Sequence, residues 1–175
     1  MFITMTGDLT AFLAVLFGYF FFWTIHSDFP PVGIDGPGWQ WPLVAGGLTL
    51  ATWAATLGAR FANAAGQVVL ARILLGAGML GAAASGLALM AGPWTTGLDP
   101  TSHAYPAIVW ALVVWIVLHL MAGIIMQAYC LARSVFDRLT PSHDADLWNV
   151  TLYWHFTGFC ALLTALVIGG FPLLQ

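Results

Sequence analysis

The 175-residue chain contains no lysine and no glutamate, and its charged side chains are seven aspartates and four arginines. A nucleic-acid surface needs clustered basic residues, so we expect no nucleic-acid partner. The two cysteines, Cys130 and Cys160, form no CxxC motif, which argues against a disulfide scaffold and a thiolate metal site. Residues 1–8 carry no basic side chain, and the apolar run behind them has no small-residue cleavage motif. We therefore expect no secretory signal peptide.

Charge of either sign is scarce, because charged residues make up 6% of the sequence and hydrophobic residues 61%. A soluble domain carries about a quarter charged residues. The mean hydropathy is +0.90. A chain of this composition has too few polar groups to cover itself in water, so the sequence indicates an integral membrane protein.

Five apolar runs are long enough to cross a bilayer as helices, for which about 20 residues are needed, or ~17 with tilt or local thinning. A membrane β-barrel would instead show alternating segments of ~10 residues. We therefore predict an all-α polytopic bundle that forms one transmembrane domain over residues 1–175. The predicted spans are residues 9–25, 41–59, 68–91, 105–132 and 152–171.

The four arginines gather in two of the four predicted loops and their flanks. Arg60 and Arg72 flank the second loop, and Arg133 and Arg138 lie in the fourth. The first and third loops are rich in proline and glycine and hold no basic residue. With five spans the two arginine loops share one side, which the positive-inside rule predicts to be cytoplasmic. The N-terminus is then cytoplasmic and the C-terminus outside.

Small residues recur at four-residue spacing in the third predicted span, at Gly78, Ala82 and Gly86. In lipid, helices are held together by the close approach of small residues and by interhelical polar contacts. The pattern predicts a helix-packing face. Two alternatives remain open for what covers it, another helix of this chain or another subunit.

The five histidines are the obvious candidate ligands of a haem or a metal. A haem b needs two facing imidazoles at similar depth, and a catalytic metal needs three or more converging ligands. At 1.5 Å per residue, His119 lies on the order of 20 Å from the cytoplasmic end of its span, whereas His155 lies about 5 Å into the next span. The two histidines are therefore poorly placed to share a haem. His26 and His103 fall on the outer side, where a surface metal is an alternative, and His143 is expected to face water.

His119 is the one ionisable residue predicted deep inside a span. Polar groups inside a bilayer are unfavourable and usually mark a purpose. The alternatives are a neutral histidine bonded to a neighbouring helix, and a contact to lipid or to a partner subunit. We expect no aspartate or glutamate within the spans, which argues against a pump or an ion-coupled transporter. Gln127 and Cys130 are expected to be packing residues, and we predict no catalytic residue and no metal ligand in this chain.

Arg133 ends the fourth predicted span, and Arg72 lies near the start of the third. A guanidinium group at a span end extends toward the lipid phosphates. The alternatives are simple interfacial anchoring and selective binding of an anionic phospholipid.

Two motifs in the last two predicted spans carry a family resemblance. One is His119-Leu-Met-Ala-Gly123, followed by Arg133, and the other is Tyr153-Trp154-His155-Phe156. Their order and spacing resemble the last two helices of subunit III of haem–copper terminal oxidases, the family that includes cytochrome c and quinol oxidases. A weaker similarity covers residues 17–27 with the F-F-W…H-S pattern of the family, then Pro30, Pro31, Trp41 and Pro42, and then Thr52-Trp53-Ala54.

The resemblance implies a short, five-helix form of a subunit that binds neither haem nor copper itself. Such a subunit packs beside the catalytic subunit I, with subunit II as a further partner, and haem and copper lie in those subunits. It supports assembly, stability, phospholipid binding and proton uptake in a bacterial-type cytoplasmic membrane. Carried over to this chain, His119 and Arg133 would line a lipid cleft with Arg133 on a phosphate, and Tyr153, Trp154 and His155 would pack the last helix.

Several departures from the family pattern argue against a role in proton delivery. Longer members have seven helices, and this chain matches the last five. The family's glutamate in the third of those seven helices has no counterpart. Ile116 replaces the first histidine of the family's H-G-x-H pattern, and Thr157–Gly158 replaces an acidic residue after Y-W-H-F. These departures leave assembly and lipid binding as the expected function.

Three alternatives stand beside this interpretation. An accessory subunit of a nitric oxide reductase shares the family's fold. A small haem-b electron carrier would use the membrane histidines, and a small transporter is disfavoured by the expected lack of acidic residues within the spans.

Overall fold

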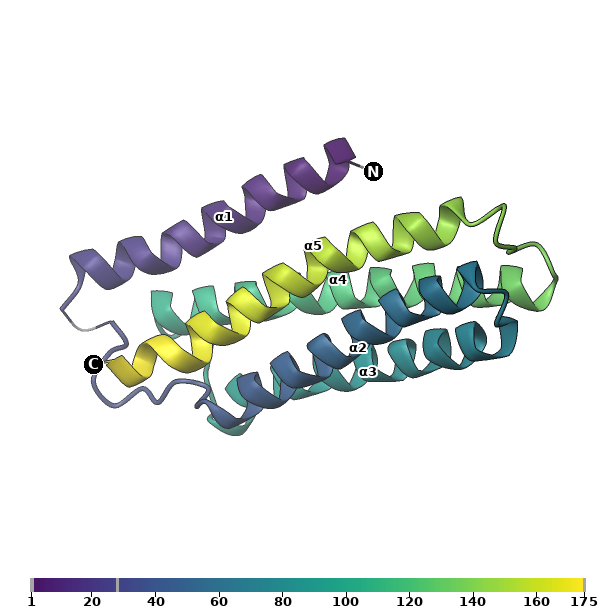
Figure 1. Ribbon diagram of the computed structural model, residues 1–175. Helices are drawn as coiled ribbons and strands as arrows, with labels where there is room; N and C mark the ends of the chain where they lie inside the picture. The colour runs from purple at the N-terminus through teal and green to yellow at the C-terminus, as the bar shows by residue number, and fades with distance from the viewer. Residues whose placement is uncertain (1, 28, 175) are drawn as a thin grey trace.

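The computed structural model describes residues 2–27 and 29–174. It contains five helices, followed by a short 3₁₀ turn, and no β-strand within the described residues (Figure 1). Each of the five helices is long and apolar enough to cross a membrane. The all-α prediction with five membrane-spanning helices is confirmed, and the chain is a multi-pass membrane protein. The elements are α1 (Phe2–Ile25), α2 (Gln40–Ala64), α3 (Val68–Thr95), α4 (Ala104–Val135), α5 (Ala145–Gly170) and η1 (Phe171–Leu174).

Two helices begin about two turns before the predicted membrane spans. The first helix begins at Phe2 rather than at residue 9, and the fifth begins at Ala145 rather than at residue 152. The predictions stopped where the apolar runs stop, but a helix continues through polar residues that find partners. The Thr6 hydroxyl donates to the Phe2 carbonyl at 2.9 Å, and the Thr10 hydroxyl donates to the Thr6 carbonyl at 2.9 Å. Such bonds to the preceding turn satisfy a hydroxyl group without a water molecule.

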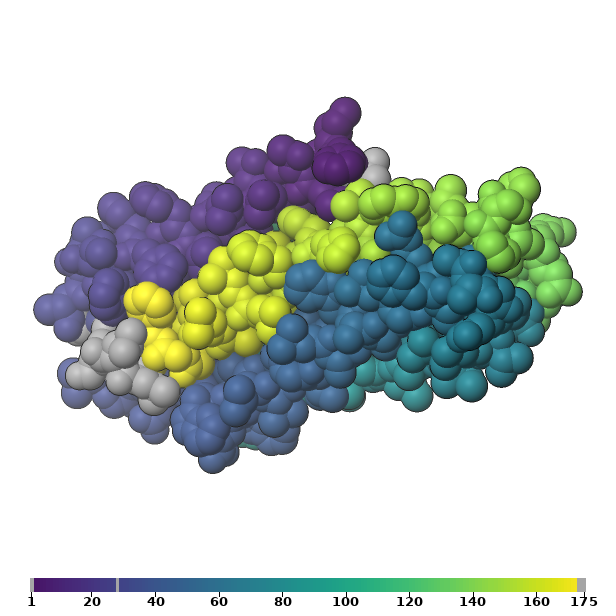
Figure 2. Space-filling model, viewed as in Figure 1, coloured from purple at the N-terminus to yellow at the C-terminus, as the bar shows by residue number. Residues whose placement is uncertain are grey.

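Helices α2 to α5 form the main bundle, and α1 lies along one side of it (Figure 1). The closest pair is α2 and α3, and α4 and α5 complete the bundle, while α1 contacts chiefly α4. Figure 2 shows α1 lying along one side of α5, with the surface of α1 that faces away from the bundle uncovered. Three side chains of α1 are buried against the bundle, Phe12, Leu16 and Tyr19. Helix α1 is therefore the most exposed of the five.

The small-residue face of α3 packs inside this chain. Gly78 and Ala82 are buried, and a Cβ atom on Gly78 would lie 2.7 Å from the side-chain nitrogen of Gln127 on α4. Gly86 faces Leu120 and Val117 of α4, at 3.7 and 3.9 Å from its Cβ position. Of the two alternatives for this face, the structure shows the intrachain one.

All four arginines lie at one end of the bundle, which we call the arginine end. It comprises Arg60 near the end of α2, Arg72 at the start of α3, and Arg133 and Arg138 around the end of α4. The opposite end is formed by residues 26–27 and 29–39 and by the connection 96–103, and η1 follows α5 there (Figure 1). An aromatic cluster closes that end, where the Phe29 ring lies 5.4 Å from the Tyr19 ring and 5.1 Å from the Tyr105 ring.

Candidate functional site

His119 lies near the middle of α4 and faces α5. Its ring nitrogen Nδ1 is 2.8 Å from the carbonyl oxygen of Trp115, one turn earlier, and the Trp115 ring stacks on it at 5.3 Å. The Tyr153 hydroxyl of α5 donates to the His119 backbone carbonyl at 3.0 Å, and the Phe156 ring lies 5.9 Å from the imidazole. The imidazole is therefore fixed in orientation by aromatic side chains from two helices.

An aspartate of α1 reaches the same histidine. Asp8 Oδ2 lies 3.7 Å from His119 Nε2, and the side chains of Asp8 and His119 are 37% and 15% exposed. Asp8 lies inside α1, so the expectation that the spans hold no acidic residue is wrong. The predicted first span begins at residue 9, directly after Asp8, because a carboxyl group interrupts an apolar run. The partner that accommodates this carboxyl group lies more than a hundred residues away in the sequence.

The two motifs of the last two helices meet across the α4–α5 contact. A Cβ atom on Gly123 would lie 2.9 Å from Cζ2 of Trp154, whose side chain is fully buried. Glycine at this position therefore makes room for the indole ring. Together with the bond from Tyr153 to His119, this contact joins both ends of the His119–Gly123 motif to α5.

His155 points to a different helix from His119. Its Nδ1 accepts a hydrogen bond from the indole nitrogen of Trp53 on α2, at 2.9 Å. A Cβ atom on Gly158 would lie 2.7 Å from the same indole ring. The segment that begins with Tyr153 thus contacts α4 through one side and α2 through the other, and His119 and His155 have separate partners.

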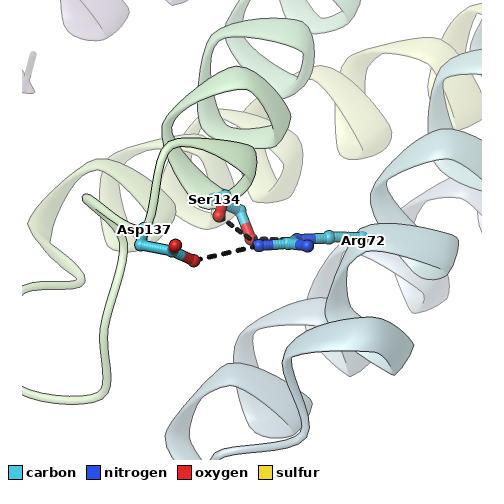
Figure 3. Close-up of polar contacts among 3 residues, drawn as sticks. All are labelled: Arg72, Ser134 and Asp137. Carbon is cyan, nitrogen blue, oxygen red and sulfur yellow. Dashed lines mark hydrogen bonds and ion pairs between the residues drawn. The ribbon is translucent and has the colours of Figure 1, made fainter.

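Arg72 binds the C-terminal end of α4 (Figure 3). Helix α4 ends in a Schellman motif, in which the Arg138 amide donates to the Arg133 carbonyl at 2.8 Å and Asp137 adopts a left-handed conformation with φ of 55°. The Arg72 guanidinium donates to the Ser134 hydroxyl at 3.0 Å, to the Ser134 carbonyl, and to the Asp137 carboxylate at 3.3 Å. These bonds attach the start of α3 to the end of α4.

Arg133 also has partners within the chain. Its guanidinium pairs with Asp146 in the first turn of α5 and donates to the Arg138 carbonyl at 3.0 Å. The side chain of Arg133 remains 31% exposed, and that of Arg72 remains 32% exposed. The structure therefore places both predicted lipid-binding arginines at the same end, each with bonds that fix the helix ends and with part of its surface open.

The remaining histidines lie near the two ends of the bundle. His103 caps α4, because its Nδ1 accepts from the Tyr105 amide at 3.2 Å. His26 stacks on Phe22 at 5.6 Å, and His143 lies 3.1 Å from the Ser142 hydroxyl. Over residues 2–27 and 29–174, no group of three or more histidine, cysteine, aspartate or glutamate side chains is placed to hold a metal ion. Cys130 and Cys160 are buried free thiols.

Sequence reasoning missed a row of polar contacts inside the bundle. The Gln127 amide donates to the Thr56 hydroxyl at 2.7 Å, and the hydroxyls of Thr49 and Ser85 are 2.8 Å apart. All four side chains are buried. The signal was available in the spacing of Thr49, Thr52 and Thr56, which places three hydroxyls on one face of α2.

An apolar groove of about 370 Å³ runs between α2 and α5 toward the opposite end. Glycines of both helices form part of its wall, and Trp39 and Leu43 stand beside them. The glycines are Gly46, Gly47, Gly169 and Gly170. A groove of this size and polarity fits an apolar chain.

Outside the membrane-spanning helices, Asp99 is held in a tight turn of the α3–α4 connection. The backbone amide and the hydroxyl of Thr101 both donate to Asp99 Oδ1 at 2.8 Å. Hydrogen bonds to the ionised carboxylate lower the pKa of Asp99, with the backbone bond as the larger cause.

No protein-family model matches this chain, and no curated protein matches it either. The case for a function therefore rests on the residues and their geometry.

Proposed function

We propose that the chain is a subunit III-like membrane subunit of a haem–copper terminal oxidase and acts in aerobic electron transport without binding a redox cofactor itself. In this proposal it packs beside the catalytic subunit I, with subunit II as a further partner. Haem and copper lie in those subunits, which reduce O2, and this chain supports assembly, stability and phospholipid binding.

The observation that carries the proposal is the contact between the two motifs that resemble the family. Tyr153 donates to the His119 carbonyl, and Gly123 leaves space for Trp154. The contact explains the glycine at residue 123, because a larger side chain there would collide with the indole ring of Trp154.

The proposal includes an orientation in a bacterial-type cytoplasmic membrane. The arginine end would face the cytoplasm, because basic residues are retained on that side. The end with η1 would face outward. The supporting observation is that the outer connections contain aspartates and no arginine.

The phospholipid part of the proposal rests on two features. The groove between α2 and α5 fits an acyl chain, and the partly exposed guanidinium of Arg133 is available to a phosphate. Replacing Arg133 with alanine is expected to lower the anionic phospholipid that remains with the purified complex, measured by mass spectrometry. Arg138→Ala serves as the control at the same end, and equal loss in both variants would contradict a specific role for Arg133.

The experiment that tests the proposal is purification of the tagged full chain from its native membrane in mild detergent. We expect a large haem-binding subunit and a copper-binding subunit to co-purify, with a haem difference spectrum and O2 consumption. Reduction of nitric oxide instead of O2 would select the reductase alternative. A haem spectrum from the chain alone would select the electron carrier.

A matched pair of variants connects this result to the motif contact. Gly123→Leu is expected to reduce the recovery of the complex at least about tenfold, because the new side chain occupies the place of the Trp154 ring. Gly76→Leu is the control, since no heavy atom outside its own helix turn lies within 4 Å of its Cβ position. Recovery that is equal for both variants would count against the proposed role of the motifs.

A further inference from the structure

Helices α2 and α5 run antiparallel and contact each other along a line that we call the α2–α5 seam (Figure 1). At the arginine end, the guanidinium carbon of Arg60 lies over the Trp148 ring, 4.3 Å from the ring centre. Seven residues deeper on each helix, the Trp53 indole nitrogen donates to His155. The two contacts therefore lie at two levels of the same seam, about 10 Å apart.

Arg60 differs from Arg72 and Arg133, which both pair with aspartates. Its side chain is half-buried, and within the described residues its guanidinium has no hydrogen-bond acceptor and no acidic partner. A guanidinium that lies over an indole ring keeps its N–H groups at the edge of its own plane, where they fit the oxygens of a phosphate. The contact with Trp148 therefore fixes Arg60 in place and leaves its donors free.

His155 presents a second free donor on the same seam. Its Nδ1 accepts the indole N–H of Trp53 at 2.9 Å, so the ring carries its own hydrogen on Nε2. His155 is exposed, and Nε2 has no partner in the part of the chain that the structure describes. A donor without an acceptor is strongly unfavourable in hydrocarbon, so an acceptor outside the bundle is expected at this level.

The two free donors lie at the two levels where a glycerophospholipid carries oxygen atoms. Arg60 lies in the last turns of α2, and His155 lies about 10 Å deeper. The headgroup region is about 5–8 Å thick on each side of a bilayer, so His155 lies near its inner border. A glycerophospholipid has its phosphate in this region and its ester carbonyls at that border. Phosphate oxygens accept from a guanidinium, and an ester carbonyl accepts from an imidazole N–H.

A helix of another protein fits these donors less well than a phospholipid does. The backbone carbonyls of a transmembrane helix are bonded within the helix, so they are not free for His155. Deeper in the membrane, the seam leads to the apolar groove, whose near end is formed by Leu50 and Leu162. Leu50 lies about 15 Å of helix below Arg60, which is half of the hydrocarbon layer and thus the depth that the tails of one leaflet reach.

We propose that the α2–α5 seam binds one glycerophospholipid of the leaflet at the arginine end, with its phosphate on Arg60 and an ester carbonyl on His155. One tail then lies along the seam and reaches the near end of the groove. Trp148 and Trp53 are positioning residues, because they orient the guanidinium and the imidazole. The inference deepens the phospholipid part of the proposed function and rests on it, but it assigns a site separate from Arg133.

The test uses the full chain in mild detergent, titrated with one lipid at a time, and native mass spectrometry measures the bound fraction. The probes are an ester-linked phosphatidylglycerol, its ether-linked analogue, which lacks the carbonyl groups, and a diacylglycerol, which lacks the phosphate. Inorganic phosphate serves as a competitor. Each variant is measured with and without Arg133→Ala, which separates this site from the phospholipid proposed at Arg133.

We expect Arg60→Ala to weaken binding of the ester-linked lipid about tenfold, because a charge-assisted hydrogen bond is lost. Arg138→Ala, which removes an exposed arginine at the same end, should bind as the wild type does. His155→Phe should weaken the ester-linked lipid about threefold and leave the ether-linked lipid unchanged. The diacylglycerol should bind equally to the wild type and to Arg60→Ala, and inorganic phosphate should not displace the lipid.

Other results would overturn the proposal. Lipid that is lost with Arg133→Ala but not with Arg60→Ala would refute this site and leave the proposed function standing. Equal weakening of the ester-linked and ether-linked lipids by His155→Phe would show that no carbonyl is bound there. Displacement by inorganic phosphate would show that Arg60 takes a free anion.

Should Arg60→Ala fail to fold, two further measurements decide the question. Arg60→Lys keeps the charge and loses the forked donors, so it should bind the ester-linked lipid less tightly than the wild type does. On the wild type itself, the ester-linked lipid should bind about threefold more tightly than the ether-linked one. Equal binding in both comparisons would overturn the proposal.

Discussion

Helices α3 and α1 each carry a face of small residues, and the two faces meet different surroundings. On α3, Gly78 and Gly86 lie against side chains of α4 and the face is buried. On α1, Gly7 and Gly18 have open space at their Cβ positions. Small residues that line up along one side of a helix therefore predict close packing but do not identify the helix that packs there. The polar residues beside each face show which of the two is covered. Gln127 of α4 passes Gly78 and donates to Thr56, whereas the Asp8 side chain is partly exposed.

The largest difference between α3 and α1 is expected when leucine replaces a glycine on the small-residue face of each helix in turn. Gly78→Leu is expected to destabilise the bundle by about 3 kcal/mol, because its first side-chain atom would already overlap the Gln127 amide. Gly7→Leu is the matched control and should change the stability of the isolated chain by less than about 0.5 kcal/mol. Unfolding in a denaturing detergent series measures both. Similar losses in the two variants would contradict the difference between the faces.

A second change sharpens the comparison by removing a polar contact that holds α3 on α4. Arg72→Ala is expected to cost about 1 kcal/mol, because three bonds to Ser134 and Asp137 are lost but the arginine is partly exposed. Arg72→Lys, which keeps the charge and loses the forked geometry, should recover less than half of this. The same detergent series gives the values, and full recovery by lysine would show that charge alone matters.

A smaller effect is expected where α5 supports the histidine that α1 contacts. Tyr153→Phe removes the hydroxyl bond to the His119 carbonyl and should cost about 0.6 kcal/mol, the mean for hydrogen bonds between membrane helices. Tyr129→Phe is the control, because the Tyr129 side chain is exposed on the same helix as His119. Equal stability of the two variants would show that this bond contributes nothing measurable.

The smallest effect is expected in the connection between α3 and α4, the two helices that meet at the buried small-residue face. Hydrogen bonds from Thr101 keep the pKa of Asp99 below its usual value. The stability that these bonds give to the folded state is therefore fully present above the unfolded pKa, about 3.9, and is lost as the pH falls through the lower folded pKa. Thr101→Val removes the hydroxyl donor and keeps the backbone donor. The pKa of Asp99 should rise part of the way toward its usual value. Carbon NMR of the Asp99 carboxyl group measures it, and an unchanged pKa would show that the backbone amide acts alone.

The sequence predicted the number and approximate places of the helices, because an apolar run of sufficient length has one stable form in a bilayer. The four-residue spacing of Gly78, Ala82 and Gly86 predicted a packing face, since spacing alone defines one side of a helix. Helix ends were harder to predict. Helix α5 begins at Ala145, among polar residues, and Asp146 in its first turn pairs with Arg133. A hydropathy pattern contains no information about such a partner.

The candidate site was less predictable than the fold. His119 and the Tyr153–Phe156 run were identified, because rare residue types in a motif are visible in one sequence. Their partners were not visible, since Asp8 comes from α1 and Trp53 from α2. The positions of Arg72 and Arg133 at span ends leave interfacial anchoring and lipid binding as alternatives, but position alone does not show that Ser134 and Asp146 are within reach of them.

The position of Asp8 and His119 has an electrical consequence. A charge that crosses the whole layer at 100 mV gains or loses about 2.3 kcal/mol. His119 lies near the middle of α4, so a unit charge at this position is separated from either surface by about half of the layer, and its energy changes by about 1.2 kcal/mol at that voltage. A charge at this position is therefore sensitive to the membrane potential.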